Sequence, residues 1–174
     1  FNVDNIRICK IIGSGVHAST VMSGMVFKRG AEGEVKQVKD GKVAVFTCPF
    51  DLTQTETKGT ILIENADELQ GYAAGEESEV EAQVKALSDA GVQVVVGAGK
   101  FGDLYLHFLN KYKIMAVRLV SKFDLRRLCR TVGAQAQARI CAPAPNLLGV
   151  VRNVEVKEIG DEEVTVFECS EEAG

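Results

Sequence analysis

The sequence lacks the features that mark membrane proteins and metal-binding proteins. No apolar run approaches the roughly 18–20 residues that a membrane-spanning helix needs. The N-terminus has neither a signal-peptide pattern nor an initiator Met, as expected of a piece cut from a longer chain. Only two His residues occur, and no C-x-x-C or H-x-x-x-H spacing is found. We therefore expect no metal site and no membrane partner.

Cysteine content and net charge further limit the class of protein to which the chain can belong. The five cysteines are scattered and odd in number, and most lie in apolar runs. This pattern favours buried free thiols in a reducing compartment over a disulfide framework. The net charge of −4 lacks the basic excess of a nucleic-acid-binding protein, so we expect no nucleic-acid partner. With 174 residues, 46% of them hydrophobic, the chain is typical of one globular domain.

Apolar runs and turn residues predict β-structure at both ends of the chain. Three strands are expected in the first part, at 6–12, 19–27 and 42–50. Pro49 would end the third strand, and the polar stretch 28–42 is expected to be a surface excursion. Near the C-terminus, residues 150–159 and 164–169 alternate apolar and polar side chains around a GDEE turn, which predicts a β-hairpin.

The centre of the chain predicts an α/β unit. Residues 92–96 and 114–120 are short runs rich in β-branched residues, which are typical of buried parallel strands. Between them, residues 101–112 place apolar side chains at helical spacing, and a further helix is expected at 121–132. The predicted fold class is therefore a mixed α/β domain with β-rich ends.

The helix expected at 121–132 has two unlike faces. Ser121 and Asp124 resemble a capping box at its start, and Gly133 suits a left-handed residue at its end. The apolar face consists of Leu125, Leu128, Cys129 and Val132. The opposite face carries an aromatic ring among arginines: Phe123, Arg126, Arg127 and Arg130. Because Arg and aromatic side chains are enriched in binding hot spots, this face is a candidate docking site, and a solvated basic face is the alternative.

An acidic segment punctuated by glycine covers residues 54–82. We expect an extended piece at 59–65 and helices at 66–74 and 76–91, with a break at Gly71 and Gly75 and a capping box of Ser78 and Glu81. Several apolar side chains of this segment have no evident place in a compact core: Ile61, Leu62, Ile63, Leu69 and Tyr72. Such a segment is typical of a lid or a binding arm.

The stretch Gly97–Gly102 matches the G-x-G-x-x-G pattern of a dinucleotide site between a strand and a helix. The acidic residue expected at the end of the next strand is absent, since Ser121 and Lys122 stand there. No G-K-[ST] motif and no nucleophile paired with His is evident. The glycines therefore favour a tight strand-to-helix turn, and a nucleotide-dependent enzyme is the alternative function.

Several blocks, in one order and spacing, resemble a known family. They are CPFD (48–51), TETKGT (55–60), GEESEVEAQVKALSDAGVQVVV (75–96), HFLNKYKIMAVRLVSKFDLRRLCRTVGA (107–134) and GDEEVTVFE (160–168). Together they resemble the apical domain of group II chaperonin subunits over nearly the whole chain. The blocks FNVDNIR and TETKGT are particularly similar to one subunit type of the eukaryotic cytosolic chaperonin (CCT, also called TRiC).

The resemblance implies one apical domain over residues 1–174, with a swivelling β/β/α fold. Residues 56–75 would form its helical protrusion, a built-in lid that contains the apolar residues named above. The two ends of the chain would be stubs of strands that lead to an intermediate domain. The full subunit would be an ATP-dependent cytoplasmic chaperone, assembled with other subunits in a double eight-membered ring. Its partners would be unfolded clients such as actin and tubulin.

The resemblance also implies a client-binding groove between the helix at 121–132 and the loop at 48–53. The residues expected to bind clients are Phe50, Asp51, Lys122, Phe123, Arg126, Arg127 and Arg130. The family's phosphate-binding GDGTT block and its catalytic aspartate are not in this sequence. We therefore expect no cofactor and no enzyme activity in this chain, with ATP and Mg²⁺ bound elsewhere in the full subunit. A structural domain whose acidic arm docks to a neighbour is a third hypothesis.

Overall fold

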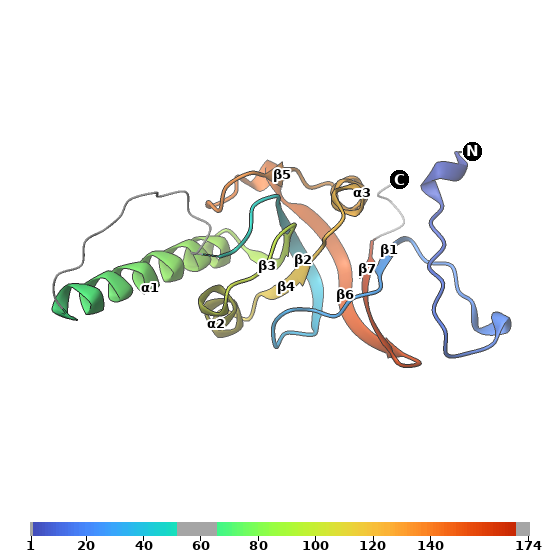
Figure 1. Ribbon diagram of the computed structural model, residues 1–174. Helices are drawn as coiled ribbons and strands as arrows, with labels where there is room; N and C mark the ends of the chain where they lie inside the picture. The colour runs from blue at the N-terminus through green and yellow to red at the C-terminus, as the bar shows by residue number, and fades with distance from the viewer. Residues whose placement is uncertain (1, 52–65, 170–174) are drawn as a thin grey trace.

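A computed structural model describes residues 2–51 and 66–169, with the backbone alone for 66–74. Its centre is a mixed seven-stranded sheet of order β1-β7-β6-β2-β3-β4, with β5 also paired to β2 (Figure 1). The strands are β1 (Gly24–Phe27), β2 (Gln37–Phe46), β3 (Val92–Gly97), β4 (Met115–Arg118), β5 (Ala136–Gln137), β6 (Gly149–Ile159) and β7 (Glu162–Glu168). The α-helices are α1 (Ala66–Asp89), α2 (Asp103–Lys111) and α3 (Lys122–Val132). The mixed α/β fold class is confirmed.

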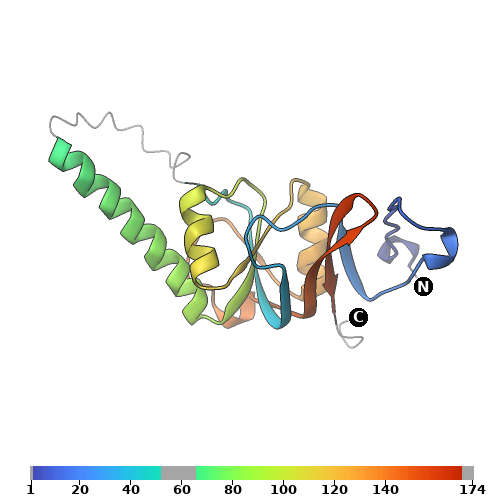
Figure 2. The same ribbon diagram turned by 90° about the horizontal axis from the view of Figure 1, so that it is seen from below.

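The parallel part of the sheet comes from the central α/β unit. Strands β2, β3 and β4 run parallel, with α1 and α2 as the crossovers between them. Helices α1 and α2 cover one face of the sheet, through buried residues such as Val84 and Phe108, and α3 covers the other face through Leu125 and Leu128 (Figure 2). Both faces of β3 are therefore covered, which explains why its sequence is an apolar run without alternation.

The antiparallel part confirms the predicted C-terminal hairpin. Strands β6 and β7 pair from Asn153 to Ile159, and Gly160 supplies the positive φ, 63°, that the tight turn requires. Strand β1 pairs with β7 at the edge of the sheet, and β6 pairs with β2 to join the two parts. One sheet thus carries both the hairpin and the parallel unit.

The N-terminal predictions are only partly correct. The described residues before β1 contain short 3-10 turns at Val3–Asn5 and Val16–Ala18 and no strand, so the strand expected at 6–12 is wrong, and only Gly24–Phe27 of 19–27 is a strand. Ile8 and Ile12 are more than 80% exposed. A β-branched run becomes a strand only where a neighbouring strand can pair with it, and none of the described strands pairs with this run.

Strand β2 and helix α1 are both longer than predicted. Residues 37–41, expected in a surface excursion, pair with β6 as the solvent-facing start of β2. Helix α1 continues through Gly75, so the break and the capping box at Ser78 and Glu81 are wrong. A helical glycine costs only about 1 kcal/mol relative to alanine, which the packing of the following turns offsets. Gly91, at φ 83°, follows the end of α1 as predicted.

Candidate functional site

The four parallel strands end at one edge of the sheet. Strands β2, β3, β4 and β5 have their carboxyl ends there, because they share one direction. Ligands of open α/β sheets bind outside this edge, where the chain changes from one side of the sheet to the other. Such a change occurs beside β2. The chain leaves β2 through α1 and returns as β3 on one side of it, whereas the chain after α3 returns as β5, which also pairs with β2.

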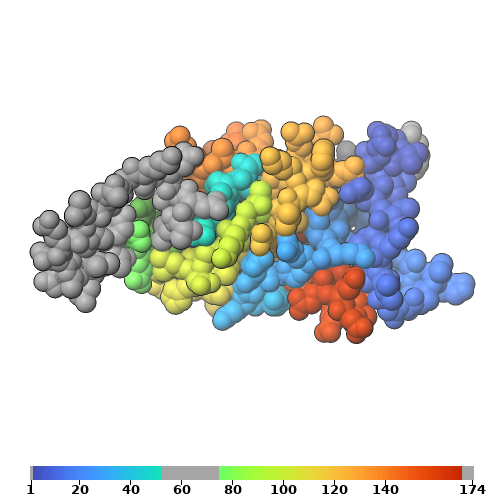
Figure 3. Space-filling model, viewed as in Figure 1, coloured from blue at the N-terminus to red at the C-terminus, as the bar shows by residue number. Residues whose placement is uncertain are grey.

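Hydrogen bonds hold the loops at this carboxyl edge together. The amide of Ala98 donates to the carbonyl of Phe46 at 3.1 Å, and that of Phe50 donates to Lys100 at 3.1 Å. The amide of Leu119 donates to the carbonyl of Gly97 at 2.9 Å. The loops that follow β2, β3 and β4 are therefore layered side by side, with the loop after β3 between the residues after Phe46 and the start of α3. In Figure 3, the loop after β2 (teal) and α3 (amber) lie on the same face of the molecule.

Phe50 does not lie on the surface of this edge. Its ring has no exposed area and stacks on Phe101 with centroids 4.9 Å apart, while Phe46 and Tyr105 contact it edge-on. The expectation that Phe50 contacts a client directly disagrees with this burial, because the loop folds the Phe50 side chain into the core. Phe50 instead anchors the loop, and the partly exposed Asp51 follows it.

Tyr105 extends this aromatic cluster and makes it sensitive to alkaline pH. Its hydroxyl donates to Gln83 Oε1 at 2.8 Å, and burial, together with the nearby negative charge of Glu79, raises the pKa of Tyr105 to about 12. The usual tyrosine value is about 10, so the folded state holds this proton more tightly than the unfolded state. The resulting stabilisation is complete below about pH 10 and is lost as the pH rises through the folded pKa.

We therefore expect the wild-type chain to lose stability relative to Tyr105→Phe between about pH 10 and pH 12. Urea unfolding across this range measures the difference between the two proteins, so that the titration of the lysines cancels. Tyr105→Phe should be less stable at neutral pH by about 1 kcal/mol, since it lacks the hydrogen bond to Gln83. A difference that stays constant with pH would contradict the role of Tyr105.

Helix α3 presents the two faces that its sequence predicts. The Ser121 hydroxyl accepts a hydrogen bond from the amide of Asp124 at 3.4 Å, and Gly133 is left-handed at φ 74°. Leu125, Leu128 and Val132 are buried on the inner face. On the outer face Phe123 is 74% exposed, Lys122, Arg126 and Arg130 are exposed, and Arg127 is half-buried. The outward position of the predicted Phe and Arg side chains is confirmed.

Two exposed residues beside this face were not predicted. Strand β4 ends at Arg118 rather than at residue 120, so Val120 lies outside the sheet and is 64% exposed. Lys100 is exposed on the neighbouring loop after β3. The sequence could have indicated that Val120 is exposed, because it directly precedes the N-cap Ser121 and so falls in the connection between strand and helix. We call Val120, Lys122, Phe123, Arg126, Arg127 and Arg130 the α3 surface.

The cations of the α3 surface have no acidic partner among the described residues. The ion pairs found there join Lys28 to Glu162, Lys111 to Glu81 and Arg7 to Asp124. The last of these, at 3.4 Å, places the Arg7 guanidinium against the one carboxylate in the first turn of α3. The α3 surface is therefore positively charged around an exposed aromatic ring.

The structure describes only part of the segment that was predicted to form the lid. Ile61, Leu62 and Ile63 lie outside the described residues, as does 56–65 of the expected protrusion. Leu69 and Tyr72 belong to α1, of which only the backbone is described at these positions. The role of this segment as a lid stays a prediction.

The space over the glycine-rich turn is filled by the chain itself. A Cβ at Gly99 would lie 2.7 Å from Pro49 Cβ, and a Cβ at Gly97 would lie 3.1 Å from the ring of Phe101. The glycines thus allow the loop after β2 to pack closely on the turn after β3. A dinucleotide would have to displace Pro49 to reach these backbone amides, so the geometry does not favour the nucleotide-dependent enzyme.

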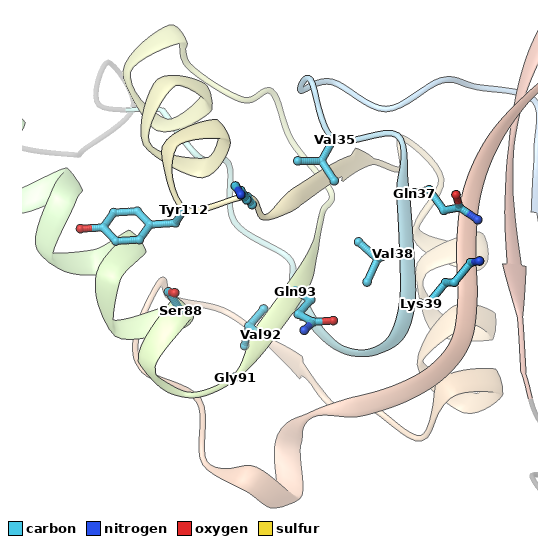
Figure 4. Close-up of a pocket in the computed structure, with 10 residues that line it drawn as sticks. Val35, Gln37, Val38, Lys39, Ser88, Gly91, Val92, Gln93 and Tyr112 are labelled. Carbon is cyan, nitrogen blue, oxygen red and sulfur yellow. The ribbon is translucent and has the colours of Figure 1, made fainter.

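The rest of the described structure adds no second candidate of comparable quality. Figure 4 shows an open pocket near the start of β2 and β3, with Tyr112 at one side and Gln37, Val38 and Lys39 at the other. Its lining contains no carboxylate, histidine or cysteine that could work with Ser88 or the lysines there. Among the described residues, no group of His, Cys, Asp or Glu side chains has a metal-binding arrangement. None of the helices described has the length and apolar character needed to cross a bilayer.

Comparison with known proteins places this geometry in context. The pattern of the TCP-1/cpn60 chaperonin family matches residues 1–174. T-complex protein 1 subunit theta from Caenorhabditis elegans is 76% identical over the whole chain, and its human counterpart is 55% identical. The chain spans 32% of the length of each of these relatives.

A solved structure also shares the fold. The open-state monomer of a group II chaperonin from Methanococcoides burtonii aligns with a TM-score of 0.64 and 21% identity. The alignment covers 90% of this chain and 33% of that monomer. At this level of identity the likeness concerns the fold alone.

Proposed function

Because the chain belongs to the TCP-1/cpn60 chaperonin family, we propose that it is the client-binding apical domain of a cytosolic chaperonin subunit. The family and the fold expected from the sequence are confirmed. The relatives are of the theta type, which is the subunit type that FNVDNIR and TETKGT resemble. The proposal concerns what this third of such a subunit does.

The α3 surface is the observation that carries the proposal. It joins an exposed aromatic ring to several cations on a helix whose inner face is fixed in the core by Leu125 and Leu128. A rigid face with one apolar anchor and many polar groups can hold a partly unfolded chain through a few strong contacts. The polar groups also limit unselective hydrophobic capture.

The loop after β2 forms the second wall of the proposed groove. Its backbone is fixed by hydrogen bonds to the turn after β3, and Phe50 anchors it from below. Asp51, Lys122, Phe123, Arg126, Arg127 and Arg130 are proposed to contact the client. Phe50 is proposed to position the loop.

The wider setting is part of the same proposal. In the full subunit, ATP and Mg²⁺ would bind outside these residues, and ATP hydrolysis would drive a cycle of client capture and release. The subunit would assemble with others in a double eight-membered ring in the cytoplasm, with residues 56–75 contributing to a lid. Actin and tubulin are proposed clients.

The double variant Phe123→Ala with Arg127→Glu is expected to bind clients about tenfold more weakly, because it removes the aromatic anchor and reverses a neighbouring charge. Fluorescence anisotropy of a labelled actin or tubulin peptide, titrated with the 174-residue chain, measures the change. Ile12→Ala with Arg152→Glu is the control, since it likewise truncates an exposed apolar side chain and reverses an exposed charge, at positions outside the α3 surface.

Hydrogen exchange locates the site independently of any substitution. An unfolded client should protect amides in 48–53 and 121–132. Protection confined to 60–74 would move client capture to the acidic arm.

Equal binding by the double variant and the wild-type chain would refute the proposed site.

A further inference from the structure

The cations of the α3 surface have a regular spacing. Arg126 and Arg130 are one helical turn apart, which separates them by about 6 Å along the axis, and Phe123 lies about 10 Å from Arg130 on the same scale. Carboxylates at i and i+4 of a helix, or at i and i+2 of a strand, have a similar separation of about 6–7 Å. The surface therefore matches a row of acids next to one apolar side chain.

The positive charge of this surface is retained in the folded chain. No described carboxylate lies within ion-pair distance of Lys122, Arg126, Arg127 or Arg130. Asp124, which shares the first turn of α3, is paired with Arg7 from the N-terminal segment. The positive end of the α3 dipole adds to the field near Lys122. An incoming carboxylate thus meets several α3 cations that no described carboxylate neutralises.

Apolar contact is available at the same place. Phe123 and Val120 are exposed on either side of the cap Ser121, at the start of α3. The rows of cations extend away from them along the helix. A ligand with a bulky apolar group at one end and acids toward the other end would cover both parts at once.

We infer that the α3 surface selects client segments in which acidic residues accompany one bulky apolar side chain. This inference rests on the proposed client-binding function and adds the chemical class of the client. Nucleic acid is less well matched, since the surface offers one aromatic ring instead of a series for base stacking, and the chain has a net charge of −4.

Three labelled peptides of equal length test the inference with the 174-residue chain. Each contains one Phe among Gly residues, followed by several Glu, Gln or Lys residues. The Glu peptide is expected to bind roughly tenfold more tightly than the Gln peptide, and the Lys peptide most weakly. Added salt should weaken binding of the Glu peptide and leave that of the Gln peptide nearly unchanged.

Substitutions connect the preference to α3. Arg126→Gln with Arg130→Gln should strongly reduce the preference for the Glu peptide over the Gln peptide, because two of the cations are removed. Both arginines are exposed, so their loss leaves the core intact. Arg152→Gln with Lys157→Gln removes the same charge from exposed positions of β6 and should keep the preference.

The remaining outcomes separate this inference from the proposal it rests on. Equal binding of the Glu and Gln peptides by the wild-type chain would overturn the acidic preference and leave client binding in place. Failure of all peptides, including those from actin and tubulin, would remove the proposed function itself. Displacement of the Glu peptide by oligothymidylate, or a salt-sensitive dimer that needs Arg126 and Arg130, would assign the surface to nucleic acid or to a second copy, against the inference.

Discussion

Replacing Phe50 with alanine is expected to lower the free energy of unfolding by about 3–5 kcal/mol, as is typical when a buried Phe leaves a cavity. The Phe50 ring has no exposed area and lies between Phe46, Phe101 and Tyr105, with centroid separations of 4.9–5.6 Å. The same ring fixes the loop after β2 to the turn after β3. Urea unfolding followed by circular dichroism measures the loss.

Phe123→Ala is the matched control for this prediction. The substitution is chemically identical, but Phe123 is 74% exposed, so its effect on stability should stay within about 0.5 kcal/mol. The two substitutions should therefore have their main effects in different assays. Phe50→Ala should mainly reduce stability, while Phe123→Ala should mainly reduce peptide binding. Similar stabilities of the two variants would contradict the burial of Phe50.

The contrast between the two phenylalanines shows what local sequence patterns can predict. The position of Phe123 follows from helical periodicity alone, since Leu125 and Leu128 determine which side of α3 faces the sheet. Phe50 lies in an irregular loop without periodicity, and its burial depends on residues about fifty positions later in the chain, in particular Phe101. The sequence therefore predicted the orientation of one wall of the proposed groove and failed on the other.

The errors in the fold have a similar origin. The central strands and α3 were predicted correctly because each is set by short-range patterns and by caps such as Ser121 and Gly133. The strand expected at 6–12 failed because pairing is a non-local property. The start of β2 was missed because residues 37–41 are polar, and their strand conformation comes from pairing with β6.

The family resemblance supplied what these patterns could not. Nothing in the residues alone distinguishes a client groove from a solvated basic face, because both expose the same side chains. The structure adds the immediate surroundings: the exposed Val120, the pairing of Asp124 with Arg7, and the arginines of α3, which form no ion pair with a described carboxylate. These surroundings make the acidic preference a property that can be measured on this chain.

Gly99→Ala is expected to lower the free energy of unfolding by about 2–3 kcal/mol, within the range for overpacking at a close contact. The new Cβ would lie 2.7 Å from Pro49 Cβ and 2.8 Å from Pro49 Cα, so the loop after β2 would have to move. Because this loop is the second wall of the proposed groove, client binding should weaken as well. Thermal and urea unfolding, together with peptide anisotropy, measure the two effects.

The control for Gly99→Ala is the same substitution in α1. Among the described residues, no neighbouring heavy atom would lie within 4 Å of a Cβ at Gly75, and alanine is the better helix former, so Gly75→Ala should raise helix stability by about 0.5–1 kcal/mol. A lower free energy of unfolding for Gly99→Ala together with a higher one for Gly75→Ala would show that Gly99 is required for packing against Pro49. A stable Gly99→Ala variant with unchanged client binding would contradict that role. The glycine-rich turn would then again be a candidate ligand site.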